Sequence, residues 1–393
     1  MKILMLLDEE FPPDPRVEHE IHALTSAGHS IVLLCPTREG KELREQWNGI
    51  QIYRKVISAF KYKSKVGALK APVYYNFWKG FFKEYRSEIG LFDVVHAHDL
   101  IMAPVAFWIQ RKFGGKTVLD LHENYPYLIR DAKHTQSKLG KFLSDHKKWI
   151  QFEKTAVVKA DKVLTVVKEM RQRVVNIGKK TDEVFVYQNV PNLSELSFLN
   201  PTEAKSDNFT LVYAGGLTPA RGLSTVLQAI SLLANEGDLK FKLVVCGTGS
   251  AEASLKEEAS ALGIQDHIDF LGWVNQKDVF TIIGKGHATI IPHYRSVQND
   301  CSSPNKLFQY MFMGKPVISS NCTSLKRLIV EENCGLIYQH DSPEDLRAVL
   351  KKLMTDEVLT KMMGDNGHKS VIKKYNVDVE KSELIEMYSN FSL

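Results

Sequence analysis

The sequence has few of the features that mark secreted, fibrous or membrane-spanning proteins. Its 393 residues include five cysteines, an odd number scattered without paired spacing, which excludes a disulfide framework or zinc module as the basis of the fold. No apolar run approaches the length of a membrane span, and Ile3 to Leu7 near the amino terminus is too short for a signal peptide. Internal repeats and low-complexity tracts are also missing. We therefore expect a globular protein of the cytosol with reduced thiols.

Strong charge of either sign is missing too. The net charge is +5, which is too mild to indicate a nucleic-acid partner. Residues 1–195 carry 31 Lys and Arg against 23 Asp and Glu, an excess of 8, and the remainder carries 20 against 23. The positive charge therefore belongs to the first half of the chain.

Buried-strand patterns alternate with helix-length segments along the whole chain, which predicts a parallel α/β architecture. A chain of this length exceeds one hydrophobic core, and the polar, proline-containing stretch after Asn189 is a natural boundary. We predict two doubly wound domains, residues 1–192 and 208–375, followed by helices in 376–393. The expected strands are KILMLL, SIVLLC, FDVVHA, KTVLDL, ADKVLTVV and EVFVYQ in the first domain, and FTLVYAGG, FKLVVCGTG, HIDFLG, ATIIPHY, KPVISS and CGLIYQ in the second.

The segment SSPNKLFQYMFMGKPVISS predicts a short helix that binds an anion. Ser303 is the expected N-cap, Pro304 the first helical residue, and Gly314 the end of the helix. The first turn offers free backbone N–H groups and Lys306, which together favour a phosphate. Gln309 lies three positions after Lys306 and so shares its face of the helix. The alternative for Gln309 is a hydrogen bond to a buried polar group of its own domain.

Glycine turns follow two strands of the second domain, where ligands bind in doubly wound sheets. Gly215 and Gly216 precede Arg221, and a second turn contains Gly247 and Gly249. Each could be a plain tight turn, but together with Lys306 they favour a diphosphate site.

The second turn also suggests the dinucleotide fingerprint of a dehydrogenase. Glu252 occupies the third glycine position, however, and Asp269 lies inside an apolar strand. Nicotinamide binding is therefore the weaker interpretation.

Histidines follow two strands of the first domain. The segment His96-Ala-His98-Asp99 could bind a metal, but no third ligand is evident, so we expect one histidine packed and the other facing a cleft. His122 follows the next strand and could be functional or simply packed.

The stretch from Arg54 to Arg86 holds nine Lys and Arg, nine aromatic residues and one acid, Glu84. One interpretation is a solvated helix face with core aromatics. The other is an amphipathic surface for anionic lipid. An RNA surface is disfavoured because no RNA-binding signature accompanies it.

In this order, the motifs resemble the family 4 (group 1) glycosyltransferases over nearly the whole chain. FPPDPRVEHEIHALTSAGHSIVLL is similar to the family's opening strand, loop and helix, FDVVHAHD and LDLHENYP to its histidine-bearing strand ends, and YAGGLTPARGL to its phosphate loop. PNKLFQYMFMGKPVISS resembles its recognition helix. The resemblance implies the GT-B fold, two Rossmann-like domains facing a central cleft, with a last helix that returns to the first domain.

The resemblance also implies the reaction and its site. The family transfers a sugar from a nucleoside diphosphate to a glycan or lipid-linked acceptor, retains the anomeric configuration and uses no metal or other cofactor; the chain has no Asp-x-Asp pair. His122, Arg221 and Lys306 would be catalytic. The donor site would comprise Gly215, Gly216, Arg221, Gly247, Trp273, Val274, Ser303, Asn305, Lys306, Leu307 and Gln309, and the acceptor site Arg16, His98, Asp99 and Glu123.

Two positions depart from the family pattern. Its two usual glutamates, eight positions apart, are replaced by Cys301 and Gln309. Gln309 keeps one oxygen that accepts from a ribose hydroxyl, so we expect a weaker ribose contact. The prediction is a cytosolic hexosyltransferase that binds nucleotide-sugar but no nucleic acid, peripheral to an anionic membrane where polysaccharides are made. The alternative is a weakly active or non-catalytic protein of the same fold that serves as the partner of another glycosyltransferase.

Overall fold

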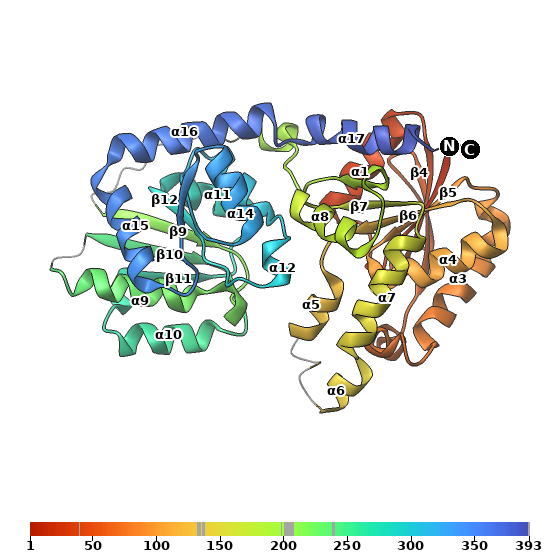
Figure 1. The fold of residues 1–393 in the computed structure, drawn as a ribbon, viewed down its shortest axis with the longest axis horizontal. Coiled ribbons are helices and arrows are strands. Elements are labelled where there is room, and N and C mark those ends of the chain that lie inside the picture. Colours follow the sequence, from red (N-terminus) through yellow and green to blue (C-terminus); the bar gives the residue numbers. More distant parts are fainter. Residues whose placement is uncertain are drawn as a thin grey trace. The chain divides into compact units, whose positions relative to one another are not determined.

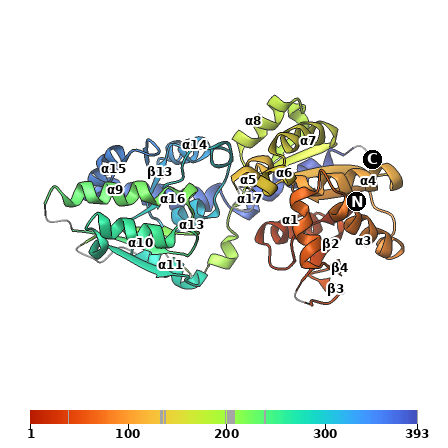
Figure 2. The ribbon, with the colours of Figure 1, turned by 90° about the horizontal axis from the view of Figure 1, so that it is seen from below.

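Two parallel sheets, each flanked by helices, make up the fold (Figures 1 and 2). The computed structural model describes residues 1–38, 40–131, 135, 138–197, 199, 208–237 and 240–391. These form one unit from Met1–Gln188 with Glu380–Leu393 and a second from Asn189–Val379. The expected boundary at residue 192 lies four residues beyond this division. The predicted pair of Rossmann-like domains is confirmed.

The first unit contains an eight-stranded sheet in the order β3-β4-β2-β1-β5-β6-β7-β8. All neighbours are parallel except β3 and β4. Its strands are β1 (Lys2–Leu6), β2 (Ser30–Thr37), β3 (Arg44–Trp47), β4 (Ile50–Val56), β5 (Val94–His98), β6 (Lys116–Leu121), β7 (Lys162–Thr165) and β8 (Val184–Val186). Its helices are α1 (Pro15–Ser26), α2 (Ala59–Lys63), α3 (Val73–Ile89), α4 (Ala103–Phe113), α5 (Tyr125–Asp131), α6 (Lys138–Leu143), α7 (His146–Lys159) and α8 (Lys168–Ile177).

The β3–β4 hairpin is an addition to the predicted strands. Asn48 and Gly49 form its turn, both with positive φ, 45° and 82°. Asn-Gly between two strands is the usual signal of such a turn, so this hairpin was visible in the sequence.

The second unit contains a six-stranded parallel sheet in the order β11-β10-β9-β12-β13-β14. Its strands are β9 (Phe209–Ala214), β10 (Phe241–Cys246), β11 (Ile268–Gly272), β12 (Ala288–Ile291), β13 (Val317–Ser320) and β14 (Gly335–Tyr338). Its helices are α9 (Leu223–Ala234), α10 (Glu252–Ala261), α11 (Gln276–Lys285), α12 (Val297–Asp300), α13 (Asn305–Phe312), α14 (Thr323–Glu331), α15 (Pro343–Thr355) and α16 (Glu357–Lys373). All the strands predicted for this domain are present.

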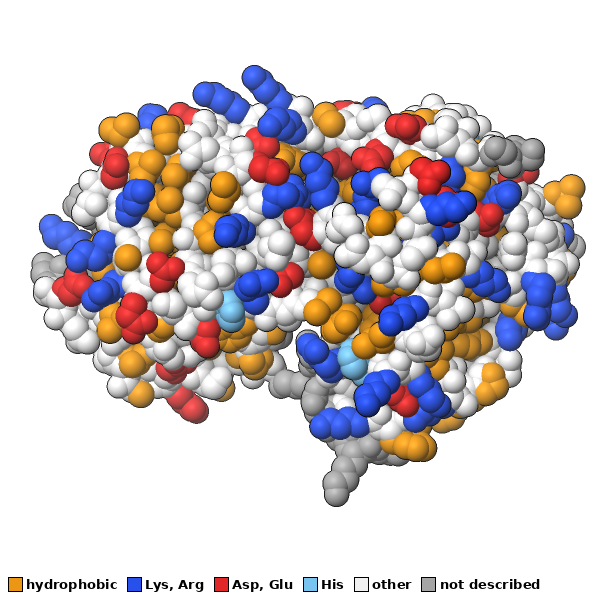
Figure 3. Space-filling view, in the orientation of Figure 1, with side chains coloured by type: hydrophobic (Ala, Val, Ile, Leu, Met, Phe, Trp, Pro, Cys, Tyr) orange, Lys and Arg blue, Asp and Glu red, His pale blue; other side chains and the backbone are white. Residues whose placement is uncertain are grey.

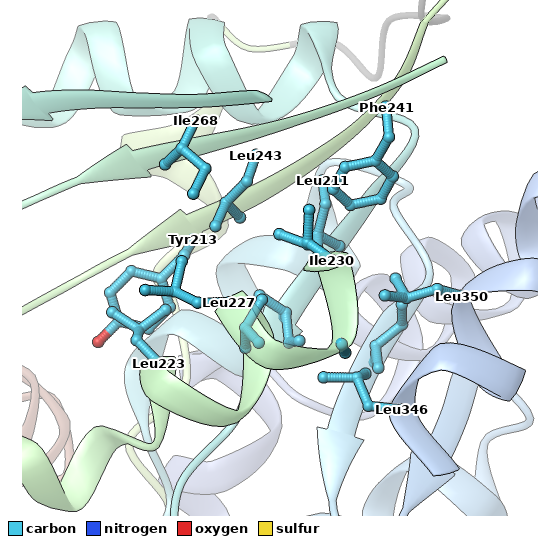
Figure 4. Packing of buried hydrophobic residues seen from close by; sticks show 14 of the residues in the cluster. Leu211, Tyr213, Leu223, Leu227, Ile230, Phe241, Leu243, Ile268, Leu346 and Leu350 are labelled. Atoms are coloured by element: carbon cyan, nitrogen blue, oxygen red, sulfur yellow. The ribbon is translucent and has the colours of Figure 1, made fainter. Parts of the chain in front are cut away.

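Alternate residues of β9 point to opposite faces, as a strand requires. Leu211 and Tyr213 pack with α9, α10 and α15, whereas Val212 and Ala214 pack with α11, α13 and α14. Figure 4 shows the first of these cores, where side chains from the strands meet those of α9 and α15. Helices therefore cover both faces of this sheet.

The last helix, α17 (Val377–Ser389), begins in the second unit, and from Glu380 onward it belongs to the first. Carboxylates of Glu380 and Glu383 accept hydrogen bonds from the backbone N–H groups of Gln188 and Val186. At its far end the Tyr388 hydroxyl lies 2.6 Å from Nδ1 of His96. These bonds attach the end of the chain to the β5–β8 side of the first sheet.

Candidate functional sites in the two units

The order of strands shows where ligands bind in each sheet. Doubly wound sheets bind ligands beyond the carboxyl ends of strands, at the point where the order reverses. In the second unit that point lies between β9 and β12, which lead into Gly215 and His293. In the first it lies between β1 and β5, which lead into Asp8 and Asp99.

Lys306, in the first turn of α13, has a buried ammonium group without a partner. No group of the described residues forms a hydrogen bond with its Nζ, which lies 4.3 Å from the centre of the Tyr213 ring. A Cβ atom at Gly215 would collide with Nζ, so only glycine allows the lysine to lie there. Burial, assisted by the charge of Arg221, lowers the pKa of Lys306 to about 7. The ammonium therefore lacks a counter-ion, which a bound anion would supply.

Arg221 is the second cationic side chain near Lys306. Its Nη1 donates to Nε2 of His293 over 2.9 Å, and His293 is fully buried. Burial and the nearby cations lower the pKa of His293 well below its usual value, which keeps the imidazole neutral and able to accept. Gly222, with φ 68°, allows close approach, because a Cβ there would collide with the carbonyl oxygen of Pro292. Among the described residues, no carboxylate pairs with Arg221.

The predicted N-cap of α13 is wrong. The helix begins at Asn305 with Pro304 as its N-cap, and Ser303 makes no capping bond. Instead, the Ser303 hydroxyl is buried with no partner among the described residues. Gly314 follows the end of the helix with φ 65°, as expected. Ser303 and Lys306 thus bring two unsatisfied buried polar groups to one helix start, which is a strong sign of a ligand site.

The loop after β9 is held in place from two sides. The Tyr213 hydroxyl donates to the Gly216 carbonyl over 2.8 Å, and Gly247 lies against the Gly215 carbonyl. The Tyr310 hydroxyl, from α13, accepts from the Ala214 N–H over 2.8 Å. Tyr310 was not predicted as a site residue, although an aromatic hydroxyl inside a buried helix needs a partner.

The remaining predicted donor residues differ in exposure. Trp273 is 78% exposed beyond β11, and Val274 is half-buried in the core of that unit. Asn305 is exposed, and Gln309 is half-buried on the same helix face as Lys306; its backbone carbonyl accepts from the Met313 N–H, whereas its side-chain amide makes no hydrogen bond with any described residue. Leu307 is fully buried in the core, so its side chain packs rather than binds, and its N–H donates to the Pro304 carbonyl.

In the first unit, Arg16, Asp120 and His122 form a connected group at the carboxyl ends of the strands. Nη2 of Arg16 donates to Oδ1 of Asp120 over 2.7 Å, and Oδ2 of Asp120 lies 2.6 Å from Nε2 of His122. Nε of Arg16 also donates to Oδ2 over 3.2 Å. Asp120 is fully buried, whereas the His122 side chain is 16% exposed. The buried anion therefore joins two cationic side chains.

Burial and neighbouring carboxylates determine the charges of this group. Burial opposes a charge on His122, but the carboxylates of Asp120 and Asp99 outweigh it and raise its pKa to about 9. Burial likewise opposes the charge of Asp120. Arg16 and His122 nevertheless hold the pKa of Asp120 well below its usual value. Burial, then repulsion from Asp120, raises the pKa of Glu20 well above its usual value. At neutral pH, His122 and Asp120 are therefore both charged.

The structure buries two of the four predicted acceptor residues. Arg16 and His98 were expected to line a site, but both side chains are buried and bond within the group. His96 is buried as well, so neither histidine of that strand faces a cleft. Asp99, with φ 64° and a side chain 29% exposed, accepts from the His122 N–H over 3.1 Å, and Glu123 is half-buried. Asp99, Glu123 and His122 remain accessible to a ligand.

Asp120 was missed because it lies inside a strand rather than after it. The signal was present, since Asp120 is the one charged residue in the apolar run TVLDL. An acid at such a position requires a buried partner. Glu20 on α1 is a second missed acid, fully buried one helical turn after Arg16.

The expectation that no third metal ligand lies near the histidines is wrong. Donor atoms of Glu20, His98, Asp120 and His122 all lie within 4.8 Å of one another. Both Asp120 oxygens, however, already accept from Arg16, and one also contacts His122. A cation bound there would have to displace a guanidinium, so this donor set fits the observed ion pairs better than a metal.

The aromatic residues of the basic stretch are mostly core. Eight side chains of α3 are buried: Tyr74, Tyr75, Phe77, Trp78, Phe81, Phe82, Tyr85 and Ile89. They cannot form an outer lipid-binding face, so that part of the amphipathic interpretation is wrong. Among the described residues, no helix is long and apolar enough to cross a membrane.

Two family models match adjacent parts of the chain. Residues 16–194 match the model described as Glycosyltransferase Family 4, and residues 197–370 match Glycosyl transferases group 1. A full-length relative, an uncharacterized glycosyltransferase of Methanocaldococcus jannaschii, is 22% identical over 99% of this chain and 98% of its own. The capsular polysaccharide biosynthesis glycosyltransferase CapM of Staphylococcus aureus is 24% identical over 47% of both chains.

Solved structures share the fold. Sucrose-phosphate synthase from Thermosynechococcus elongatus matches with a TM-score of 0.75 at 15% identity, over 99% of this chain and 98% of its own. HepE from Anabaena, crystallised with UDP, matches with a TM-score of 0.71 at 13% identity over all of both chains. The likeness places both units in the GT-B architecture.

Proposed function

Because this chain belongs to the family 4, group 1 glycosyltransferases, we propose that it transfers a hexose from a nucleoside-diphosphate sugar to a glycan or lipid-linked acceptor. The anomeric configuration is retained, and no metal or other cofactor takes part. UDP is the first nucleotide to test, since HepE was crystallised with UDP and with UDP-glucose.

One observation carries the proposal: a buried cationic position that lacks its anion. Nζ of Lys306 and Oγ of Ser303 are buried without partners at the start of α13. Arg221 lies close enough to lower the pKa of Lys306, and the Gly215 loop leaves room beside Nζ. A diphosphate supplies the charge and the acceptor oxygens that these groups lack.

The same groups give the catalytic contribution. When the bond between the sugar and the β-phosphate breaks, negative charge develops on the departing diphosphate. Lys306 and Arg221, already in place, stabilise that charge more than they stabilise the intact donor. His122 is protonated on both ring nitrogens at neutral pH, and it acts toward the donor sugar as a positively charged hydrogen-bond donor.

The acceptor side belongs to the first unit. Its accessible polar groups are Asp99, Glu123 and His122. The buried side chains of Arg16 and His98 hydrogen-bond to Asp120, which in turn contacts His122. We place the enzyme in the cytoplasm at the membrane surface, with a basic, apolar face. Exposed there are Lys141, Phe142 and Leu143 of α6 and Lys147 and Lys148 of α7, where Figure 3 shows blue lysine and arginine side chains gathered.

Phe142 supports this surface directly, being 66% exposed with Nζ of Lys70 3.9 Å from its ring centre. Vesicle sedimentation should rise with anionic lipid and fall with salt, and Phe142→Ser should weaken it. Leu91→Ser, at a leucine before β5 that is 82% exposed, is the control. No binding at low salt would indicate a soluble acceptor.

A second candidate function rests on the two replaced glutamates. With Cys301 and Gln309 in their places, the chain would bind nucleotide-sugar weakly and serve as the partner of another transferase. Its distinguishing property is nucleotide binding without turnover.

One experiment separates these alternatives. Thermal shift against nucleoside diphosphates and their sugars identifies the donor, and transfer or hydrolysis of that donor tests catalysis. Lys306→Met should abolish the thermal shift, whereas Lys285→Met, at an exposed lysine of α11, should preserve it. A shift without turnover would support the partner function, and no shift with any nucleotide would exclude both.

A further inference from the structure

We propose that Asp120 is a positioning residue, which fixes the ring of His122 through Nε2 and keeps it charged so that Nδ1 donates a hydrogen bond to a substrate oxygen. The role of His122 toward substrate rests on the proposed function. The pairing of Asp120 with His122 does not, because it rests on distances within the first unit alone.

The geometry of β6 brings the two residues together. Asp120 and His122 are two positions apart, so they leave the strand on the same face. Oδ2 of Asp120 lies 2.6 Å from Nε2 of His122, a distance typical of a charge-assisted bond. This contact uses Nε2, and Nδ1, which lies 3.6 Å from Oδ2 of Asp99 and makes no hydrogen bond with it, is the nitrogen that a ligand can reach.

Asp120 is itself held rigidly. Nε and Nη2 of Arg16 form a fork on its two oxygens, and Nη1 of Arg16 donates to the Tyr187 carbonyl over 2.7 Å. Asp120 is fully buried, so solvent cannot replace these bonds. Arg16 therefore links α1, the residue after β8 and β6, and its bonds to Asp120 determine where the His122 ring can lie.

Taken together, the charged and titratable groups around His122 favour the protonated, positively charged imidazole. The carboxylates of Asp120 and Asp99 favour the positive charge of His122. Oδ2 of Asp99 lies 3.6 Å from Nδ1 of His122. His98, whose Nδ1 lies 3.2 Å from Nε2 of His122, stays neutral because burial lowers its pKa to about 3. Arg16 opposes the charge on His122, and burial raises the pKa of Glu20 well above its usual value.

A merely structural role for Asp120 is the competing explanation. In that case Asp120 neutralises buried Arg16, and His122 is a bystander whose protonation would not depend on the carboxylate. The two explanations differ in the titration of His122, which does not require any substrate.

The test is NMR titration of the full-length protein with labelled histidine, in which His122 is identified by the signal lost in His122→Gln. In the native protein His122 should titrate near 9. In Asp120→Asn, which preserves shape but removes charge, the value should fall to or below the ordinary value of about 6.5. Asp161→Asn removes a carboxylate that binds Thr117 at the amino end of β6, and should leave His122 unchanged.

Activity provides a second, separate measurement. In Asp120→Asn the alkaline limit of kcat should move down by at least one pH unit, with a smaller change in the KM for the donor. If no donor supports turnover, the proposed function fails, while the titration still decides the role of Asp120.

A native His122 that titrates at or below about 6.5 would overturn the proposal, even if Asp120→Asn fails to fold. An unchanged His122 pKa in folded Asp120→Asn would overturn it equally.

Discussion

The two units contain buried cations with opposite arrangements of counter-charge. In the first unit, Arg16 and His122 share the carboxylate of Asp120, so the protein itself supplies the anion. In the second unit, Lys306 and Arg221 have no carboxylate among the described residues, and Arg221 pairs with the neutral imidazole of His293. One group is complete within the protein, and the other requires a ligand.

This difference predicts how each unit responds to mutation. Removing the Asp120 carboxylate leaves Arg16 with Glu20 and His122 with Asp99 as the remaining counter-charges, which costs stability. Removing a cation that has no partner relieves a desolvation cost, and the loss appears only when the ligand binds. The predictions below test this contrast, beginning with the largest expected effect.

Asp120→Ala should lower the free energy of unfolding by about 3–5 kcal/mol, since it breaks a buried ion pair from one side. Lys306→Met should leave that free energy unchanged or raise it. Denaturant unfolding of both variants measures the contrast. Equal losses in the two would show that Lys306 has a structural partner within the protein.

Arg221→Ala and Lys306→Ala should each weaken nucleoside-diphosphate binding by about 2 kcal/mol, roughly thirtyfold, with the fold intact. Calorimetry against the nucleotide found by thermal shift provides the measurement. Asp120→Asn provides the comparison from the other unit, and it should bind the nucleotide normally. Unchanged affinity in either alanine variant would remove that residue from the site.

Gln309→Leu should weaken nucleotide binding by about 1 kcal/mol, because one neutral hydrogen bond to the ribose is lost. Against the 2′,3′-dideoxy nucleotide the same change should cost close to nothing. Gln309→Glu should tighten only the normal nucleotide, since a carboxylate accepts from both hydroxyls. Equal losses for the two nucleotides would place Gln309 outside the ribose contact.

Local patterns predicted most of the fold and the glycine turn that follows β9. Buried strands and the glycine turn at Gly215 depend on neighbours in sequence, so the sequence alone was enough to predict them. The start of α13 was misplaced by one residue, because Pro304 rather than Ser303 occupies the N-cap position and the Ser303 hydroxyl is buried without making a capping bond.

The buried group of the first unit could not be predicted in this way. Arg16 and Asp120 lie 104 positions apart, and they meet only because α1 packs over the strands that carry the histidines. His98 faces Asp120 through the register of β5 and β6, in which these two residues are direct partners. Register of parallel strands is determined by tertiary packing, and no local pattern encodes it.

The pH dependence of nucleotide binding tests the central claim most directly. In the free protein Lys306 has a pKa of about 7, and a bound diphosphate favours its charged form, so binding above pH 7 must take up a proton. Calorimetry between pH 7 and 9, in buffers of different ionisation enthalpy, should show proton uptake and an affinity that falls by up to about tenfold per pH unit. Lys306→Arg, always charged, should bind without this dependence. An affinity independent of pH over this range in the native protein, with no proton taken up, would contradict the account of the unpaired lysine as the diphosphate site.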